Sequence, residues 1–518
     1  MNKLSQKVLF PLSALILLSG CTAVGPDYSP PLSPSPANFG GSIAGMGSGA
    51  VEIEWWKTFD DPALVILIQR SLAANHDIGI AVARLEEANA ILRENRQNFL
   101  PLGGIESGYE HRRQSRTESS SGQTSQFDTY RIAVDSSWEI DLFGRVLRSV
   151  EMAQAQAGSR EALLRHVQAG VAASVAATWF ELRGVEAELA VVTDISQSQR
   201  ESFRQTERSV KAGSASQFDQ LRAEALLRNI EAAVPELERR RTASVNALAI
   251  LLGAVPQDFK LPAAVPSTTQ THKTLVLRTL DVGDPASLLS RRADIAAAER
   301  SLAAATARVG IDTASLYPDV QIQGSIGLVA GSLNAMNDTR ILSGFIGPII
   351  RWSFLDTARV RAQIAASEAR TKAALIVYDQ TVLRALQETD DAFKAYDAAN
   401  KTFELHQLES VAHSDAARLA QLRFSLGEGI YSDVLEAQKS DFISRRALAI
   451  AYTNQQLAIV SIYKALGGGG KFVQRKIVIV QGLRAGNIPM LKIKFKMNKK
   501  ILDLALRGNL MLLPNNHI

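Results

Sequence analysis

The chain has 518 residues, 46% hydrophobic and 21% charged, and a formal net charge of +5. That charge comes from residues 471–518, which hold ten Lys and Arg and one acid, so the net-negative body gives no reason to expect nucleic-acid binding. The single cysteine excludes an intramolecular disulfide. No stretch after the N-terminus reaches the roughly 20 uninterrupted apolar residues of a membrane helix. If the chain spans a bilayer, it must use strands.

The N-terminus predicts a secretory signal over residues 1–20. Lys3 and Lys7 precede an apolar stretch, and Leu18-Ser19-Gly20-Cys21 follows it. These four residues resemble the bacterial lipoprotein cleavage box, which implies acylation of the Cys21 thiol and sorting to the outer membrane. The alternative is an ordinary signal peptide with a chance cysteine. Residues 21–53, rich in Pro, Gly and Ser, predict an extended lipidated tether.

A helical pattern runs from Glu54 to about Phe99, and Pro101 closes it. After this point apolar and polar residues alternate with a period of two, which predicts β-strands at 105–112 and 130–141. Together they would form a hairpin with one apolar and one polar face. The same pattern returns later in the chain. There the apolar positions are Val320, Ile322, Ile326 and Leu328 on one strand, and Ile346, Ile350, Trp352 and Phe354 on the return strand.

These hairpins have two interpretations. In a soluble protein the apolar face would pack on a core. Against this, strands of about 9–11 residues can cross a bilayer at a tilt, and aromatic residues gather at strand ends as they do at membrane interfaces. Trp138 and Trp352 are therefore predicted to lie at the periplasmic interface.

Each hairpin precedes a long helix without proline, over residues 145–212 and 359–426. Each run stops at a glycine, Gly213 or Gly427, and at about 1.5 Å per residue would be on the order of 100 Å long. Returning helices are predicted at 216–253, broken by Pro235, and at 431–467. Residues of the same type recur 214 positions later in the chain: Trp138 corresponds to Trp352, and Gly213 to Gly427. This regular spacing indicates an internal repeat.

The predicted domains are repeats at 54–255 and 291–470, joined by a linker at 256–290 with a short strand at 274–280. Four strands cannot close a barrel, and lipid does not tolerate open sheet edges. Three chains would supply twelve strands, enough for a lumen, above a long helical tube. The predicted fold is therefore α+β, a trimeric membrane β-barrel continuing into a periplasmic α-helical barrel. The basic tail, 471–518, is interpreted as a disordered extension or the product of a shifted reading frame, with a membrane or partner-binding arm as the alternative.

Several motifs together resemble the outer-membrane factor family, in particular its lipoprotein efflux branch. They are the duplicated layout, the cleavage box with Cys21-Thr-Ala-Val-Gly-Pro-Asp-Tyr28, and Glu54-Trp-Trp-Lys-Thr-Phe-Asp-Asp-Pro62. The resemblance implies a trimeric exit duct of a tripartite efflux pump, engaged by a periplasmic adaptor and an inner-membrane transporter. The chain departs from the family pattern in two places. One is Ala293, where the family commonly has Pro, a difference that would loosen that helix start. The other is the basic tail.

The resemblance also implies a periplasmic gate formed by Asp433 and Glu436, which share a helix face, with Asp219 as the first-repeat equivalent. The alternative is that these acids only favour helix starts, since Ser216-Gln-Phe-Asp219 fits a capping box. Arg222, at the position equivalent to Glu436, is expected to pair with an acid.

No phosphate loop, nucleophile motif or metal-ligand set stands out, so we expect no enzyme activity and no cofactor beyond the lipid on Cys21. Two other functions remain open: an outer-membrane duct for protein secretion, and a periplasmic coiled-coil scaffold lipoprotein. The amphipathic hairpins argue against the scaffold, because it would never span the membrane.

Overall fold

The structure, a computed structural model, describes residues 23–32, 53–118, 122–261, 288, 290–337 and 339–468. The chain divides into two units, residues 1–472 and 473–518, and all the described residues belong to the first. Cys21, the strand predicted at 274–280 and the basic tail lie outside the described residues.

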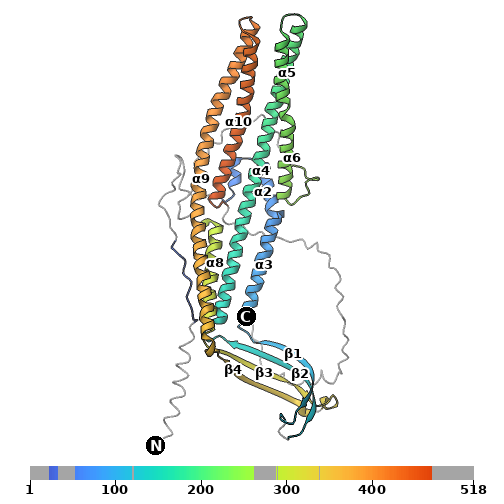
Figure 1. The fold of residues 1–518 in the computed structure, drawn as a ribbon, viewed down its shortest axis with the longest axis vertical. Coiled ribbons are helices and arrows are strands. Elements are labelled where there is room, and N and C mark those ends of the chain that lie inside the picture. Colours follow the sequence, from blue (N-terminus) through green and yellow to red (C-terminus); the bar gives the residue numbers. More distant parts are fainter. Residues whose placement is uncertain are drawn as a thin grey trace, which may run out of the picture. The chain divides into compact units, whose positions relative to one another are not determined.

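The second half of the chain repeats the order of elements of the first: helix, β-hairpin, long helix, returning helix (Figure 1). The first half contains η1 (Trp55–Phe59), α2 (Pro62–Ala74), α3 (His76–Gln97), β1 (Leu102–Gln114), β2 (Ser125–Ile140), α4 (Arg145–Lys211), α5 (Gln217–Glu231) and α6 (Ala233–Leu251). The second contains α8 (Ala293–Ala314), β3 (Asp319–Ala330), η2 (Asn334–Asn337), η3 (Thr339–Ile341), β4 (Leu342–Arg351), η4 (Phe354–Asp356), α9 (Thr357–Ser425) and α10 (Tyr431–Ala465).

Both long helices end as predicted. Gly213 and Gly427 take the left-handed conformation, with φ of 75° and 80°. The N–H groups of Gly213 and Ser214 return to the carbonyls of Val210 and Ser209, and the turn at Gly427 repeats this pair of bonds. These are the hydrogen bonds of a Schellman motif, which satisfies the last carbonyls of a helix and favours glycine at that position.

The predicted break at Pro235 is confirmed, and it lies slightly upstream of the proline. Helix α5 ends at Glu231 and α6 begins at Ala233. Proline has no N–H to donate to the carbonyl four residues earlier, here that of Glu231, so the helix is interrupted one turn before the ring. At the other repeat, α10 is continuous over the whole return.

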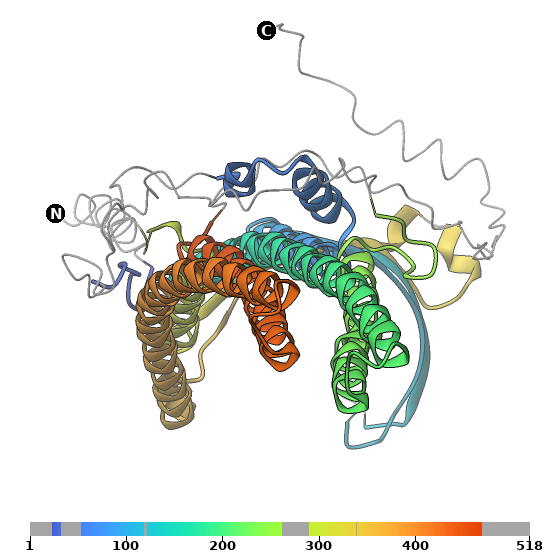
Figure 2. The same ribbon diagram turned by 90° about the horizontal axis from the view of Figure 1, so that it is seen from above.

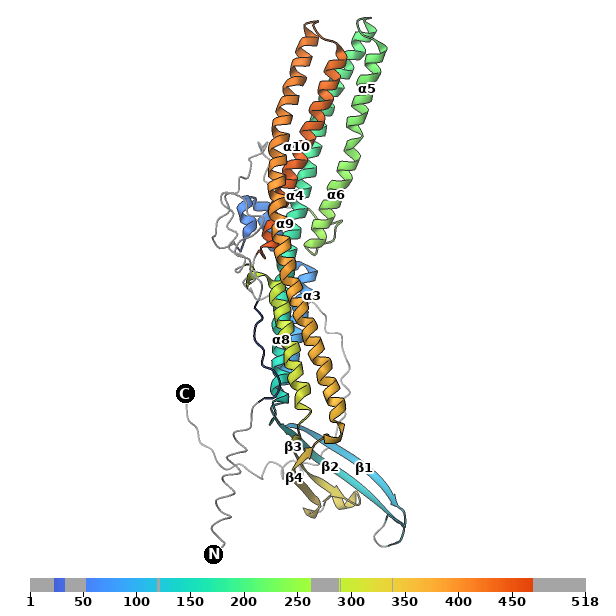
Figure 3. The same cartoon turned by 60° about the vertical axis from the view of Figure 1, so that its left-hand side comes forward.

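The four strands form one antiparallel sheet in the order β1-β2-β3-β4 (Figure 3). Pairs such as Ile132 with Leu328 and Trp138 with Ile322 stand opposite each other, so the apolar faces of the two predicted hairpins join into one surface. Strand β4 ends at Arg351. Assigning Trp352 and Phe354 to this strand was wrong, because the chain turns there into η4 before α9 begins.

The helices lie in an arc when viewed along their length, with two helical hairpins side by side (Figure 2). One is α4 with α5 and α6, the other is α9 with α10, and α4 packs against α10 between them. Among the described residues, no helix combines the length and the apolar composition needed to cross a membrane.

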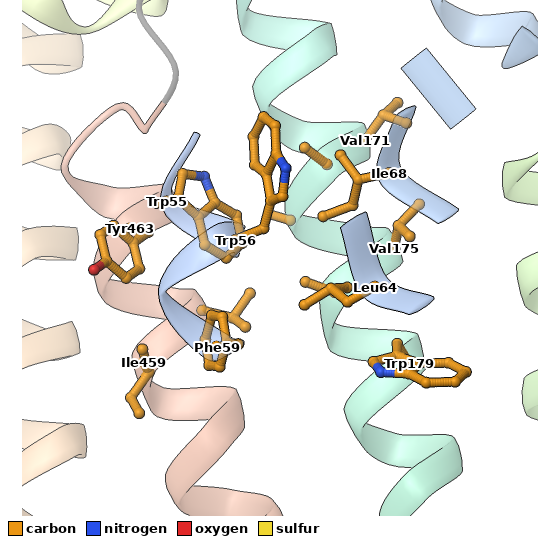
Figure 4. Close-up of a cluster of buried hydrophobic side chains, with 14 of the residues drawn as sticks. Trp55, Trp56, Phe59, Leu64, Ile68, Val171, Val175, Trp179, Ile459 and Tyr463 are labelled. Carbon is orange, nitrogen blue, oxygen red and sulfur yellow. The ribbon is translucent and has the colours of Figure 1, made fainter. Parts of the chain in front are cut away.

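The core lies where residues 55–68 pack across α4 and α10 (Figure 4). Trp55 stacks on Tyr463 of α10, with ring centroids 5.0 Å apart. Asp61 caps α2 through the N–H groups of Ala63 and Leu64, and its other oxygen accepts from the Trp179 indole at 2.7 Å. The Trp-Trp and Asp-Asp-Pro motif thus fastens the two repeats together.

The sequence predicts an extended tether over residues 21–53, and the structure shows that residues 23–28 of this segment are bound to the body. They are held against the body: the Val24 N–H donates to the Phe143 carbonyl at 3.1 Å, and the Tyr28 hydroxyl donates to Glu299 of α8 at 2.7 Å. Sequence composition describes the chain's flexibility when it is free, and it cannot reveal that the folded body offers these partners.

Candidate functional site

The two turns that close the helical hairpins lie at the end of the long helices remote from the sheet (Figure 1). One turn connects α4 to α5 and the other connects α9 to α10. Of the residues predicted for the gate, Asp219 and Asp433 lie in the first turns of the helices that follow, and Glu436 lies one turn further along α10. The structure therefore brings both repeats' predicted gate residues to the same end of the molecule.

Asp433 and Glu436 are both exposed on α10, on the side opposite two buried neighbours. Val434 and Leu435 are only 0% and 4% exposed. The Glu436 carboxylate lies 3.6 Å from Lys439 Nζ, whereas no basic group in the described part of the chain pairs with Asp433. The apolar pair holds this end of the helix in place, and the two acids face away from the packed side.

Asp219 has the geometry of a helix cap. The Ser216 hydroxyl accepts from the Asp219 N–H at 3.1 Å and lies 2.6 Å from its carboxylate. This matches the capping alternative stated for the sequence. A role for Asp219 at the gate stays a prediction.

Arg222 does not pair with an acid within the described part of the chain, so that expectation is wrong for a single chain. Its guanidinium carbon lies 5.5 Å from the centroid of the Phe218 ring, one turn earlier on α5. A guanidinium over an aromatic face gains electrostatic attraction and keeps its donors available.

A groove of about 500 Å³ separates the two tips. Its walls combine polar side chains of α4 with exposed apolar residues of both turns, among them Phe218 and Ile430, which are 66% and 64% exposed. Exposed apolar groups beside a concave surface are typical of protein-binding sites.

Tyr431 is a residue of this site that the sequence did not single out. Its hydroxyl lies 2.7 Å from Thr206 Oγ1 and 3.1 Å from Ser202 Oγ, both on α4. Thr206 is only 6% exposed. The contact joins the first residue of α10 to the neighbouring hairpin. A tyrosine at a helix start carries no such signal by itself, because its partners are more than two hundred positions away.

Two ion pairs continue this junction between α4 and α10 toward the sheet. Arg445 lies 2.8 Å from Asp194, and Arg446 lies 3.0 Å from Glu188. Glu188 is 3% exposed and also pairs with Arg240 of α6 at 3.2 Å. Asp441, on α10 beside these groups, has its pKa raised by burial, since the nearby Arg445 and His413 offset the loss of water only in part.

We expect Tyr431→Phe to loosen the tip. The substitution removes the contact between the hairpins at a net loss of about 1 kcal/mol, while Thr206 keeps its bond to the Ser202 carbonyl. Single-channel recording should show an open fraction raised roughly fivefold. Tyr396→Phe is the matched control, because the Tyr396 hydroxyl has no hydrogen bond to any described residue. Equal open fractions for wild type and Tyr431→Phe would exclude this contact as a restraint.

Trp138 and Trp352 lie at corresponding points of the two repeats, at the junction of sheet and long helices. Each indole donates to a carbonyl at the end of the preceding segment, Trp138 to Phe99 at 2.9 Å and Trp352 to Leu316 at 3.0 Å. The rings are 38% and 56% exposed. Near the other end of the sheet, Tyr109 and Tyr130 are in ring contact at 4.9 Å, a pair that the sequence analysis missed.

Comparisons with known proteins agree with this architecture. The family model for outer membrane efflux proteins matches residues 67–254 and 285–468. The solvent efflux pump outer membrane protein SrpC of Pseudomonas putida is 31% identical, over 89% of this chain and 97% of its own. The outer membrane protein OprJ of Pseudomonas aeruginosa is 29% identical over 93% of this chain and 100% of its own. The solved outer-membrane channel OprN is 32% identical and superposes with a TM-score of 0.80, covering 86% of this chain and 99% of its own.

SrpC is thus named as the outer membrane protein of a solvent efflux pump, OprJ as an outer membrane protein, and OprN as an outer-membrane channel. The protein described here is accordingly an exit duct in the outer membrane that extends into the periplasm, and it works as a channel rather than as an enzyme. The efflux function is therefore favoured over the secretion duct and the periplasmic scaffold. With a family model matched over most of its length, the chain belongs to the outer membrane efflux protein family.

Proposed function

We propose that three copies of this chain form one continuous duct, with a twelve-stranded barrel in the outer membrane and an α-helical tube below it. The observation that carries the proposal is the four-stranded sheet, in which β1 and β4 each have one edge that no described strand of the chain pairs with. Unpaired backbone groups at such edges are not tolerated in lipid. Pairing β4 of one copy with β1 of the next gives the backbone groups of every edge strand a hydrogen-bond partner.

The two faces of the sheet support this arrangement. One face carries exposed apolar residues, including Ile105 and Ile346, which are 80% and 81% exposed. The other carries Glu106, Arg131 and Asp135, as expected for a water-filled lumen. From Tyr130 to Trp138 the strand advances about 26 Å at roughly 3.3 Å per residue, close to the height of the apolar band of outer-membrane barrels. Tyr109 with Tyr130, and Trp138 with Trp352, would then mark the two membrane interfaces.

Asp433 and Glu436 would form the periplasmic gate. A threefold axis along the tube would bring two carboxylates from each chain to the narrow end. Rings of acidic side chains in a narrow pore attract cations and oppose anions. The buried Val434 and Leu435 would keep the resting entrance closed.

Recording from single channels in planar bilayers tests this gate. Asp433→Ala with Glu436→Ala should lower the preference for cations and raise the conductance, while export in cells stays near normal because the assembled pump opens the entrance. The charge-preserving pair Asp433→Glu with Glu436→Asp should keep the selectivity. Unchanged selectivity and conductance in the alanine variant would show that the two acids serve only the helix start.

The tip groove, with Phe218 and Ile430 exposed beside it, is the surface that we assign to a periplasmic adaptor, which would connect the duct to an inner-membrane transporter. The cargo would be drugs or other small toxic compounds, since the relatives include efflux proteins named for solvents and toluene. Acylation of Cys21 would anchor the chain in the same membrane as the barrel.

A further inference from the structure

The N-terminal residues 23–28, here called the strap, occupy a seat on α4 and α8. Arg148 lies at the centre of the seat and is only 4% exposed. Its guanidinium donates to the carbonyls of Val24 and Gly25 at 3.2 and 3.5 Å, and to the Asp27 carboxylate at 2.7 Å. A buried guanidinium needs partners, and here the strap supplies most of them.

Three glycines allow the strap to lie this close to the body. A Cβ added at Gly25, whose φ is +89°, would come within 2.5 Å of Gly310 Cα on α8. One added at Gly144 would come within 2.4 Å of Ala23 Cβ, and one at Gly310 within 2.8 Å of the Arg148 side chain. The strap backbone therefore meets the α8 backbone directly at Gly25, and a side chain at any of the three positions would have to displace its neighbour. At the other end of the strap, Tyr28 contacts Glu299 and packs against Ala155, Ala303 and Ala304.

The strap runs toward the junction of sheet and long helix. Its first described residue, Ala23, lies against Gly144, the residue that precedes α4, and Val24 bonds to Phe143. Trp138 and Trp352 mark the same junction. Cys21 is two residues before Ala23, so its Cα lies within about 7 Å of the Ala23 Cα.

We infer that the strap and its seat form an anchor clamp, whose partner is the inner-leaflet surface of the membrane that holds the sheet. The seat fixes the height at which the acyl chains of Cys21 leave the protein, at the level of the Trp138 and Trp352 rings. This gives the Val-Gly-Pro-Asp-Tyr motif a purpose: Gly25 makes the close approach, while Asp27 and Tyr28 fix the register. The inference rests on the proposed lipidation of Cys21 and on the proposed membrane position of the sheet.

Cells grown with a photoactivatable palmitate test the clamp through the position of its cross-links. After illumination, adducts in the wild type should concentrate on peptides of the junction, around residues 138–147 and 316–318. Inserting eight Gly and Ser residues between Thr22 and Ala23 leaves the seat intact and adds roughly 25 Å of reach. The fraction of adducts on junction peptides should then fall at least threefold.

Arg148→Met removes the guanidinium donors but keeps the apolar stem, and should disperse the adducts as the insertion does. It should also expose residues 23–32 to added protease. Arg160→Met is the matched control, an exposed arginine on the same helix with no strap contact, and should leave both readouts unchanged. A heat-resistant trimer band on gels verifies that each variant has assembled.

The outcomes separate the clamp from the channel. If the variants are labelled and assembled but keep the wild-type adduct pattern, the clamp is overturned. The proposed duct is not affected by that result. Cys21→Ser defines the background of adducts from labelled phospholipids, and the wild type must exceed it at the junction. A wild type with no adducts above this background would overturn the lipid anchor and the clamp together, while single-channel conductance would still report on the proposed duct.

Discussion

Replacing Arg292 with Met should destabilise the fold well beyond the effect of an ordinary surface substitution. The Arg292 side chain is buried between the start of α8, the middle of α9 and the end of α10. It donates to both oxygens of Asp294 at 3.0 and 2.6 Å, to Glu388 at 2.7 Å and to the Ala465 carbonyl at 2.9 Å. Breaking a fully buried ion pair costs about 3–5 kcal/mol, but Asp294 and Glu388 are 23% and 58% exposed and water screens them in part, so a loss of about 2–3 kcal/mol is expected here.

The loss should depend on pH in a defined direction. Burial raises the pKa of Asp294, but the hydrogen bond and charge of Arg292 outweigh it and hold the pKa below its usual value. A lowered pKa contributes stability that is present above the unfolded-state pKa, about 4, and is lost as pH falls through the folded-state value. Without Arg292, burial raises this pKa and His166 and the Ile295 N–H oppose it less than Arg292 did, so Asp294 binds a proton at a higher pH than in the wild type. The difference between variant and wild type should therefore narrow as pH falls from 7 toward 4.

Chemical unfolding of the detergent-solubilised protein, followed by helical circular dichroism, measures this difference. Arg418→Met is the control, because Arg418 is 68% exposed on α9 and, among the described residues, pairs only with the exposed Asp415. It should change stability by less than about 0.5 kcal/mol. A loss for Arg292→Met no greater than for the control, or one that grows toward pH 4, would contradict the assigned role.

The elements of the fold could be predicted because their signals are local. Helix ends at Gly213 and Gly427 follow from the conformational freedom of glycine, and the break near Pro235 follows from its missing N–H. The sheet follows from alternation of apolar and polar residues, although the strands extend beyond the predicted limits, β2 starting at Ser125 rather than Tyr130. Loop-like polar residues at a strand end do not prevent pairing when a partner strand is available.

The partners of polar side chains could not be predicted, since they depend on contacts between distant segments. Arg222 was expected to meet an acid and instead lies over Phe218. The residues that join the two hairpins, Tyr431 with Thr206 and Glu188 with Arg446, come from opposite halves of the chain. The role of Asp433 and Glu436 needs neighbouring copies around an axis, so it stays a prediction.

Ala293 shows the limit of reading a single position. Its replacement of proline predicted a looser start of α8, yet the helix begins at this residue. Proline at a first helical position helps by fixing φ in advance. Here the ion pairs of Arg292 with Asp294 and Glu388 tie the same turn to α9, which restrains the helix start by another means.

Trp55→Ala should destabilise the helical part of the molecule by about 3–5 kcal/mol, the range measured when large aromatic residues are removed from cores. Trp55 is 1% exposed, stacks on Tyr463 with an interplanar angle of 14°, and meets Trp56 edge-on at 5.8 Å. The backbone of Gly468 closes the cavity from the other side, where an added Cβ would come within 2.9 Å of the indole. The ring therefore joins the N-terminal segment to the end of α10.

Comparing Trp55→Ala with Trp138→Ala tests whether that loss belongs to the core. Trp138 has the same side chain, but it is 38% exposed and lies near the end of β2, where the sheet meets the long helices. Trp55→Ala should lower the denaturant midpoint of the helical signal and leave the barrel's insertion into lipid unchanged in correctly assembled protein. Trp138→Ala should have a small effect on the midpoint and reduce quenching of the remaining fluorescence by lipids brominated near the headgroup. If both variants lose the same stability, then Trp55 does not join the two repeats as its packing indicates.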